Sequence, residues 1–428
     1  MKTLIVNAGS SSQKSCLYEI VGDALPNHPP QPLWEGQIDW THRQGLAELK
    51  VKTASGAILK EELQLESRPA VLAHLLKTLW SGNTQVIEQP EAIDVVGHRV
   101  VHGGLEYQQS TIINSEVKEA IARLATLAPA HNPANLEGVE VCEQILGKVP
   151  QVAVFDTAFH AQIPEAAAIY PGPYEWVEQG IRRYGIHGIS HQYCAERTAQ
   201  ILGRDLLSLR LITCHLGNGC SLAAIRNGRS VDTTMGFTPL EGLMMGSRSG
   251  SVDPGILIYL LRQYNYSADK LDELLNKESG LQGVSGVSSD LRQILEAIAS
   301  GNHRAQLAVD IYLHRLRSGI GAMLANLGGL DALVFTAGVG ENAALIREAA
   351  CTAFEFLGLK LDPEKNTPSP FDREITTPDS AVRVLVIHTQ EDWAIACECW
   401  QLLLKTGVDV ANRRNNADFA VSRPRLSK

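Results

Sequence analysis

The sequence predicts an α/β fold divided into two domains. Its 428 residues are more than one hydrophobic core usually organises, so two domains of about 150–250 residues each are expected. Short apolar runs typical of buried strands alternate with longer segments of helical spacing. A strand–turn–strand pattern also occurs twice, near the N-terminus and again in the second half of the chain.

The two strand–turn–strand segments have turns of the same character. The first turn lies in residues 7–12 and is followed by Lys14, and the second lies in residues 215–219. Small residues at such turns let backbone N–H groups point at an anion, and a nearby hydroxyl or lysine adds to the attraction. Two hairpins of this kind facing each other would form a cleft for a chain of phosphates.

The first half of the chain alternates strands and helices. Apolar runs predict strands at 46–51, 93–97 and 152–155, and helical spacing predicts helices at 68–80, 115–127 and 135–146. The strand at 93–97 leads into residues 98–104, where Arg99 precedes two glycines. This arrangement suits an anion site at the mouth of an α/β sheet. An arginine that is merely paired with a surface carboxylate is the alternative.

Asp156 stands at the carboxyl end of the strand at 152–155. A carboxylate in that position suits a catalytic or metal-linked role, because ligands of α/β sheets bind at the carboxyl ends of strands. A cap for the next turn explains the residue equally well. The domain boundary is expected soon after it, in the proline-rich residues 164–173.

Three segments of the second half suit phosphate chemistry. Residues 182–191 are dense in cationic and ring groups and place two histidines among glycines. Residues 245–251 form a glycine- and serine-rich loop around Arg248. A strand at 333–336 enters the glycines of 338–342 before a helix, which permits close approach of a nucleotide. One Gly-x-Gly is weak support by itself.

The other elements of the second half are mostly helical. Helical spacing covers residues 254–276 and 287–326, with a helix start at 288–292. An irregular loop, a last strand and a final helix are predicted at 361–380, 382–387 and 391–404.

Composition restricts the function classes. The net charge of −9 argues against a nucleic-acid partner, because no basic stripe occurs before the C-terminal tail. The eight cysteines fit no disulfide or metal-binding spacing, and residues 1–10 lack the organisation of a signal peptide. No apolar run reaches the ~18 residues that a membrane span needs. The sequence therefore predicts a reduced, cytoplasmic protein without a nucleic-acid or membrane partner.

A set of motifs occurs in a single order from residue 3 to about residue 400. They are NAGSSSQK, GHRVVHGG, APAHNPAN, FDTAFH, RRYGIHGISH, CHLGNGCSLAAI, GFTPLEGLMMGSRSG, SGVSSDLR, FTAGVGEN and the segment at Glu391. Together they resemble the acetate kinase family, within the larger group of actin-like, sugar-kinase-like phosphotransferases. Any one motif is weak, but their common order covers almost the whole chain.

The resemblance implies two actin-like, ribonuclease H-like domains from a duplication. ATP or ADP and Mg²⁺, for which Mn²⁺ could substitute, would lie in an interdomain active-site cleft. The expected divisions are an N-terminal domain at 1–160, a nucleotide-binding domain at 161–388, a returning helix at 389–404 and a polar, disordered tail at 405–428. A homodimer is also implied. The implied reaction is the reversible, ATP-dependent phosphorylation of acetate to acetyl phosphate.

The resemblance further assigns roles to matching residues. Asn7 and Glu391 would bind Mg²⁺, and Asp156, His187 and Arg248 would act at the transferring phosphoryl group. The phosphates and nucleotide would contact Ser10, Ser12, Lys14, His215, Leu216, Gly217, Asn218, Gly219, Asp290, Leu291, Arg292, Gly338, Val339, Gly340, Glu341 and Asn342. The carboxylate substrate would contact Arg99 and His131, in an acyl pocket lined by Val101, Ala130, Ile186 and Pro239.

This assignment is chemically consistent. A small carboxylic acid is already ionised at neutral pH, so its phosphorylation needs no strong base. The difficulty is to bring an anion up to a polyanion, which calls for positive charge concentrated at one point. Asp156 would then orient the carboxylate or a metal-bound water rather than remove a proton.

Two substitutions leave the preferred acid open. Ala130 and Ile186 stand where acetate kinases usually carry leucine and phenylalanine, so the pocket would admit one or two more methylenes. A buried methylene is worth ~0.8 kcal/mol, which makes propionate a competing substrate. A phosphatase of the same fold and a non-catalytic actin-like protein are alternatives from other classes. The intact set of Arg99, His187 and Arg248 argues against both.

Overall fold

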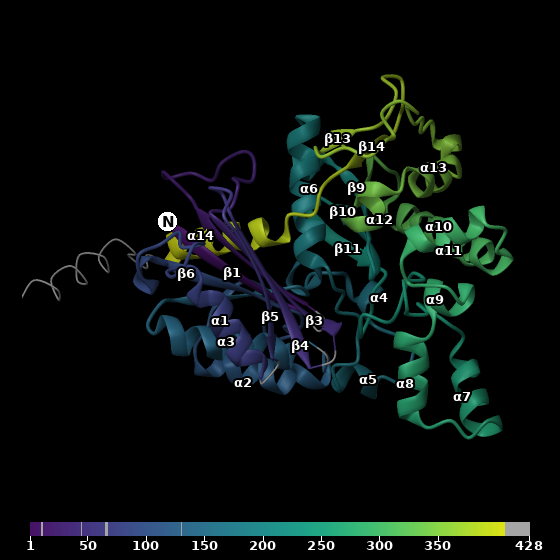
Figure 1. Ribbon diagram of the computed structural model, residues 1–428. Helices are drawn as coiled ribbons and strands as arrows, with labels where there is room; N and C mark the ends of the chain where they lie inside the picture. The colour runs from purple at the N-terminus through teal and green to yellow at the C-terminus, as the bar shows by residue number, and fades with distance from the viewer. Residues whose placement is uncertain (10–11, 44, 65–66, 130, 407–428) are drawn as a thin grey trace, which may run out of the picture. The chain divides into compact units, whose positions relative to one another are not determined.

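The computed structural model describes residues 1–9, 12–43, 45–64, 67–129 and 131–406. The chain divides into two compact units (Figure 1). Unit 1 comprises Met1–Phe155 and Asp392–Lys428, and unit 2 comprises Asp156–Glu391. The division falls directly after a strand, so the proline-rich residues 164–173, where the boundary was expected, lie inside unit 2. Of the tail predicted at 405–428, Lys405 and Thr406 belong to the last helix, and residues 407–428 fall outside the described residues, as do the predicted site residues Ser10 and Ala130.

Unit 1 is built on one mixed sheet with helices on both faces. Its strands are β1 (Lys2–Ala8), β2 (Ser12–Glu19), β3 (Trp34–Arg43), β4 (Leu46–Thr53), β5 (Ile58–Gln64), β6 (Val95–Val100), β7 (Thr111–Ile112) and β8 (Gln151–Phe155). Its helices are α1 (Arg68–Lys77), α2 (Ser115–Arg123), α3 (Asn132–Leu146) and, from Asp392 onward, α14 (Glu391–Thr406), with short 3₁₀ turns η1 (Pro90–Ala92) and η2 (Leu124–Thr126).

The sheet of unit 1 brings three strand ends to one edge. Its order is β5-β4-β3-β2-β1-β6-β8-β7, in which β1, β6 and β8 run parallel. β1 and β2 form the predicted antiparallel hairpin, in which Asn7 is opposite Lys14. Because β1 and β6 are parallel neighbours, the residues after Val6 and the residues around Arg99 lie at the same edge of the sheet.

The two faces of this sheet are covered by helices from opposite ends of the chain. One apolar cluster joins Leu4, Val6 and Val96 to buried side chains of α1 and α3. A Cβ at Gly97, which points to the other face, would lie 2.7 Å from Ile395 and Cys399 of α14. Figure 1 accordingly shows α1 and α3 on one side of the strands and the yellow α14 on the other. The sheet core therefore requires the C-terminal helix.

Unit 2 contains a second mixed sheet and most of the helices. Its strands are β9 (Arg210–Leu216), β10 (Cys220–Arg226), β11 (Arg229–Thr233), β12 (Ala332–Thr336), β13 (Arg373–Glu374) and β14 (Arg383–Val386). Its helices are α4 (Glu165–Ala168), α5 (Glu175–Glu178), α6 (Gly188–Leu202), α7 (Pro254–Gln263), α8 (Ala268–Lys277), α9 (Gly280–Ser285), α10 (Leu291–Ala299), α11 (His303–Leu327), α12 (Ala337–Asn342) and α13 (Ala344–Thr352). The 3₁₀ turns are η3 (Ala158–His160), η4 (Leu206–Ser208) and η5 (Glu355–Leu357).

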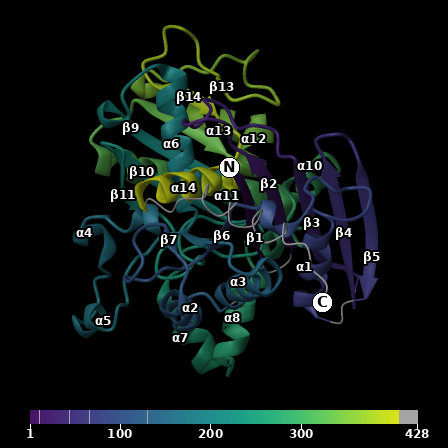
Figure 2. The same ribbon diagram turned by 90° about the vertical axis from the view of Figure 1, so that its left-hand side faces the viewer.

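The second sheet repeats the strand pattern of the first. Its order is β11-β10-β9-β12-β14-β13, with β9 and β10 antiparallel and β9, β12 and β14 parallel. The β1–β2 hairpin and its parallel neighbours β6 and β8 thus correspond to the β9–β10 hairpin and β12 and β14. Helix α6 packs on one face through Cys194 and Ala195, and α11 packs on the other, where Gly319 approaches Leu222 (Figure 2).

Most predicted elements occur near their expected bounds, and the differences are mainly at element ends. The helix predicted at 68–80 ends at Lys77, and the strand predicted at 93–97 spans Val95–Val100. The helix predicted at 115–127 ends at Arg123 and gives way to a 3₁₀ turn, and the helix predicted at 135–146 begins earlier, at Asn132. The loop at 361–380 contains the short strand β13. Among the described helices, none has the length and apolarity required to cross a membrane. All eight cysteines are free thiols.

Candidate active site

The first turn of unit 1 presents oxygen and amide groups. Asn7, the penultimate residue of β1, donates from its amide nitrogen to Oδ1 of Asp392 over 3.1 Å. This bond engages the amide nitrogen of Asn7, and the amide oxygen of the same side chain is the kind of hard ligand that Mg²⁺ prefers. Ser12 begins β2 and the side chain of Lys14 is exposed. Asp392 was not predicted, although it is adjacent to Glu391 at the start of the last helix.

Arg99 and Val101 are held at the end of β6 by asparagines of α3. The side chain of Asn135 accepts from the N–H of Val101 (3.1 Å) and donates to the carbonyl of Ala8 (2.9 Å). Asn132 binds the backbone N–H and carbonyl of His102 in the same way, at 3.1 Å each. Both asparagines are buried, so α3 fixes the ends of β1 and β6 side by side. The side chain of Arg99 is half-buried at this edge.

His131 lies next to Asn132 and Asn135, which together are called the asparagine clamp below. It stands at the N-terminus of α3, directly before Asn132, and its side chain is half-buried. Its carbonyl accepts from the N–H of Asn135 over 2.9 Å. In unit 1 the structure therefore gathers Asn7, Arg99, Val101 and His131 around the ends of β1 and β6. Sequence reasoning missed the asparagine clamp, although two asparagines at helical spacing in one motif were a visible signal.

Asp156 binds the start of α6 in unit 2. Its carboxylate is fully buried and accepts from the backbone N–H groups of His187 (3.1 Å) and Ile189 (3.4 Å). His187 itself has a left-handed backbone conformation with φ of 61°, which is uncommon for a side chain other than glycine. The capping role considered for Asp156 is thus real, but it serves a helix some thirty residues along the chain.

Four histidines gather beside this helix start. The rings of His187 and His215 stack with centroids 4.0 Å apart, and His160 and His191 pack against the same group. Burial lowers the pKa of His160 to about 4 and, together with the neighbouring histidines, holds the pKa of His191 well below its ordinary value. These two rings are therefore neutral at physiological pH.

Arg248 approaches His187 across the second turn. Its Nη1 donates to the carbonyl of Pro239 over 2.7 Å. A Cβ at Gly219 would lie 2.8 Å from Nη2 of Arg248 and 3.4 Å from Cε1 of His187. Burial lowers the pKa of Arg248, yet an arginine keeps its charge at neutral pH. Unit 2 thus brings together the three predicted catalytic residues Asp156, His187 and Arg248 near the turn at Gly219. Because glycine has no side chain, this turn leaves space for Arg248 and His187.

Three further segments meet around the same turn. Gly246 allows the side chain of Asn218 to approach, since a Cβ there would lie 2.1 Å from Asn218 Oδ1 and 3.1 Å from the carbonyl of Ser289. A Cβ at Gly217 would lie 3.7 Å from Ala337, the first residue of α12. The turn at 215–219 therefore lies close to the residues that directly precede the predicted nucleotide segments 290–292 and 338–342.

Several of the predicted nucleotide contacts make bonds within the protein. Glu341 accepts from the N–H of Thr389 over 2.8 Å, which holds the segment before Glu391 to α12. Asp290 caps α10 and forms an exposed ion pair with Arg292, with Nη2 and Oδ2 2.6 Å apart. The carboxylate of Asp290 is thus engaged, while Gly338 has open space around its Cα.

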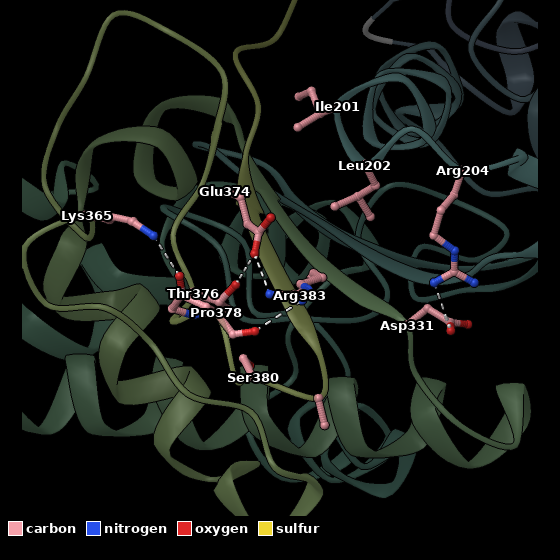
Figure 3. Close-up of a pocket in the computed structure, with 11 residues that line it drawn as sticks. Ile201, Leu202, Arg204, Asp331, Lys365, Glu374, Thr376, Pro378, Ser380 and Arg383 are labelled. Carbon is pink, nitrogen blue, oxygen red and sulfur yellow. Dashed lines mark hydrogen bonds and ion pairs between the residues drawn. The ribbon is translucent and has the colours of Figure 1, made fainter.

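A separate polar pocket of about 700 Å³ lies elsewhere in unit 2 (Figure 3). None of the predicted site residues lines it. Its cationic groups have acceptors within the protein: Arg204 pairs with Asp331, Arg383 pairs with Glu374, and Lys365 donates to the carbonyl of Thr376. The pocket is therefore polar but largely neutralised internally.

Nearly the whole chain matches proteins of one family. Residues 2–397 match the acetokinase family. The chain belongs to the acetokinase family. A protein of Cyanothece sp. named acetate kinase is 70% identical over 403 residues, which are 94% of this chain and 98% of that protein. An acetate kinase of Gloeobacter violaceus is 67% identical over 404 residues, 94% of this chain and all of that protein.

Solved acetokinase structures have the same fold. The acetate kinase of Porphyromonas gingivalis is 42% identical, with a TM-score of 0.87 over 94% of this chain and 99% of that one. The propionate kinase of Francisella tularensis is 38% identical, with a TM-score of 0.83 over 93% and 98%. These matches confirm the predicted family and the fold of two actin-like α/β domains. As an acetokinase, the protein is a phosphotransferase.

Proposed function

We propose that this protein transfers the γ-phosphoryl group of ATP to acetate, reversibly, forming acetyl phosphate and ADP. The observation that carries the proposal is the meeting of Arg248, His187 and Asp156 at the glycine turn of unit 2. Support also comes from relatives named acetate kinase that are 70% identical over nearly the whole chain.

The carboxylate is the nucleophile in the proposed reaction. One of its oxygens forms a bond to the γ-phosphorus in line with the breaking bond to the β-phosphate oxygen, and ADP leaves with that electron pair. No proton has to move, because the acid is already ionised. Arg99 at the end of β6 would bind the carboxylate. The family resemblance assigns contacts with its short apolar part to Val101 and His131 of unit 1 and to Ile186 and Pro239 of unit 2.

The residues of unit 2 would stabilise the charge on the moving phosphoryl group. The planar fork of Arg248 suits its equatorial oxygens, and its backbone anchor at Pro239 orients it in advance. Removing one such donor costs roughly 3–4 kcal/mol of barrier. Asp156 would act through the backbone of His187, whose left-handed conformation it holds, rather than by accepting a proton.

The residues present also suit Mg²⁺ and a nucleotide. The amide oxygen of Asn7, oriented by Asp392, and the carboxylate of Glu391 are hard oxygen ligands. Bound Mg²⁺, or Mn²⁺ in its place, would neutralise phosphate charge. Ser12 and Lys14 would contact phosphates, and residues 215–219, 290–292 and 338–342 would hold the nucleotide, whose approach the open space at Gly338 permits.

One assay tests the proposed function. ADP release from MgATP is measured with acetate, propionate, butyrate or no acid, and the acyl phosphate is trapped with hydroxylamine. We expect ADP release that depends on the acid and equals the trapped product, highest with acetate. ADP release that is indifferent to the acid would contradict the proposal, and a preference for propionate would assign the chain to that acid. If label from the γ-phosphate remains on the denatured protein at a stoichiometric level, the reaction proceeds through a phosphoenzyme and not by direct transfer.

Matched arginine variants test the role of unit 2. Arg248→Ala should lower kcat by about 10²- to 10³-fold. Arg226→Ala, at an exposed arginine in the β10–β11 hairpin, should leave kcat unchanged. Equal losses in both variants would show that the effect is not specific to the site.

We further propose a homodimer and a cytoplasmic location. Helix α7 carries a run of apolar side chains, Ile256 to Leu261, yet none of its residues is buried. A helix that is apolar on all sides normally packs against a partner, and a second copy of this chain fits the family resemblance. Eight free cysteines suit a reducing compartment.

A further inference from the structure

Three buried side chains form an unbroken hydrogen-bonded chain behind His187. Thr213 Oγ1 lies 2.7 Å from His191 Nδ1, and His191 Nε2 lies 2.8 Å from Ser221 Oγ. Ser221 Oγ lies in turn 2.9 Å from His187 Nδ1. Thr213, His191 and Ser221 have no exposed surface, while the ring of His187 is only partly covered. The chain therefore runs from the interior of the second sheet to a predicted catalytic residue.

His191 carries a single proton in this chain. Its burial, with smaller contributions from His160 and His215, holds its pKa well below the ordinary value, so the ring is neutral at physiological pH. A neutral imidazole donates from one nitrogen and accepts at the other. The contacts of His191 with Thr213 and Ser221 therefore have opposite directions.

Thr213 decides which direction holds. Within the described part of the chain, His191 is the one hydrogen-bond partner of the Thr213 hydroxyl. A buried hydroxyl that donates to nothing is costly, so Thr213 donates to Nδ1 of His191. The proton of His191 must then be on Nε2, from which it donates to Ser221.

The hydroxyl of Ser221 accepts one hydrogen bond of this chain and donates the next. It has one hydrogen, and it already accepts from His191, so it donates to Nδ1 of His187. We propose that Thr213, His191 and Ser221 form a directed chain that fixes His187 as a neutral imidazole with its proton on Nε2. In this role the three are positioning residues, since they act on His187 and not on a substrate.

The proton on Nε2 faces the glycine turn. A Cβ at Gly219 would lie 3.5 Å from that nitrogen, and Nη2 of Arg248 is on the same side of the turn. Among the described residues, the charged and titratable groups near His187 include Asp156, His191, His215 and Arg248, and His160 packs against His191. A neutral donor can stack on His215 and lie near Arg248 without adding a second positive charge. The position of the proton follows from the hydrogen bonds and the neutral state of His191, whereas its donation to a phosphoryl oxygen rests on the proposed function.

Nuclear magnetic resonance of the whole protein tests the tautomer directly. The ring nitrogens are observed in long-range ¹H–¹⁵N spectra of protein labelled with ¹⁵N-histidine, without nucleotide, at neutral pH. The signals of His187 are identified by their loss in His187→Gln. We expect a protonated Nε2 and an unprotonated Nδ1. A protonated Nδ1, or an imidazolium ring, would overturn the proposal whatever reaction the protein catalyses.

Variants at Thr213 separate the directed chain from ordinary packing. Thr213→Val keeps the shape of the side chain but removes the donor that sets the direction. We expect this variant to have a mixture of both neutral tautomers of His187. Its kcat should be about tenfold lower, as is often found when a residue that orients a catalytic group is lost, with little change in the KM for ATP. Thr213→Ser should restore both readouts. A Thr213→Val protein whose His187 spectrum equals that of the wild type would contradict the proposal, and if this variant does not fold, the wild-type spectrum decides.

Discussion

Gly219 lies where two predicted catalytic side chains approach the second turn. Any side chain there would meet the guanidinium of Arg248 at 2.8 Å, which is closer than a carbon normally comes. The ring of His187 is on the same side, at 3.4 Å. The turn is therefore open because it lacks a Cβ, and its glycine is needed for space beside the arginine.

A single methyl group at this position should disable the protein without unfolding it. We expect Gly219→Ala to displace Arg248 and to lower kcat by about 10²-fold, comparable to loss of a transition-state donor. Steady-state kinetics with a thermal unfolding curve measures both properties. Gly321→Ala is the matched control, because among the described residues no atom beyond the local backbone of α11 lies within 4 Å of a Cβ added at that position. Wild-type kcat in Gly219→Ala would show that Arg248 is not constrained by the turn.

The sequence predicted which residues belong to the candidate site better than it predicted their hydrogen-bond partners. The motifs pointed to Asp156, His187 and Arg248, which the structure gathers at one turn. The partners of these residues were not predictable, because Ser221 is one polar residue in an apolar strand and its contacts come from α6. Which nitrogen of a ring faces which hydroxyl depends on packing between elements distant in the chain.

At the scale of elements, α3 does more than cover the sheet. Through Asn135 it joins the carbonyl of Ala8, at the end of β1, to the N–H of Val101, after β6. Both of these backbone groups leave their strands at this point and need another partner. One buried amide with a donor and an acceptor satisfies both at once.

Loss of that amide should destabilise unit 1. Asn135→Ala would leave a buried carbonyl and a buried N–H without partners, so we expect unfolding to become easier by roughly 2–4 kcal/mol. The KM for the carboxylate should rise as well, because Arg99 is close to the released strand end. Guanidinium denaturation followed by circular dichroism measures the first effect. Asn276→Ala, at a half-buried position of α8 where the side-chain amide bonds to Asp272 of the same helix, should change neither quantity. An Asn135→Ala protein as stable as the wild type would refute the bridging role of Asn135.

Element order was more predictable than element boundaries. The buried strands β8 and β12 are short apolar runs whose period and length identify them. The start of α3 was placed too late, because the asparagine and proline at its first turn resemble a loop in sequence. They belong to the helix because the side chain of Asn132 forms hydrogen bonds with the backbone of His102. Tertiary bonds of this kind decide helix ends and are invisible to local patterns.

At the scale of the whole molecule, two buried histidines in the described part of each unit have lowered pKa values. Burial lowers the pKa of His98, His102 and His160 to about 4, and that of His191 well below its ordinary value. The folded protein therefore binds fewer protons than the unfolded chain between about pH 4 and 6.5. The stabilisation is complete above about pH 6.5 and is lost as the pH falls toward 4.

The free energy of unfolding should thus decline on mild acidification. Each of the four histidines contributes a slope of up to about 1.4 kcal/mol per pH unit below pH 6.5. Denaturant titrations between pH 5 and 7.5 measure this slope. His98→Asn removes one of the titrating rings and should lower the slope by the contribution of one histidine, up to about 1.4 kcal/mol per pH unit. A free energy of unfolding that is constant over this range would contradict the neutral state of these rings.

Helix α7 should control assembly of the whole molecule. We expect Ile256→Asp to convert a dimer into monomers, because a carboxylate cannot be buried in an apolar contact without a partner. Size-exclusion chromatography with light scattering measures the change. Leu345→Asp, at an isolated exposed leucine of α13, serves as the control and should remain dimeric. A wild-type protein that is monomeric at micromolar concentration would rule out the proposed dimer.

The return of the chain to unit 1 sets an order of events during synthesis. Unit 2 is one continuous segment and can fold as soon as residue 391 has left the ribosome. The first sheet remains open on one face until α14 supplies Ile395 and Cys399 beside Gly97. Although unit 1 is translated first, it is therefore the last to be completed. A truncated chain that lacks α14 would expose this sheet face and become a substrate for chaperones and proteases.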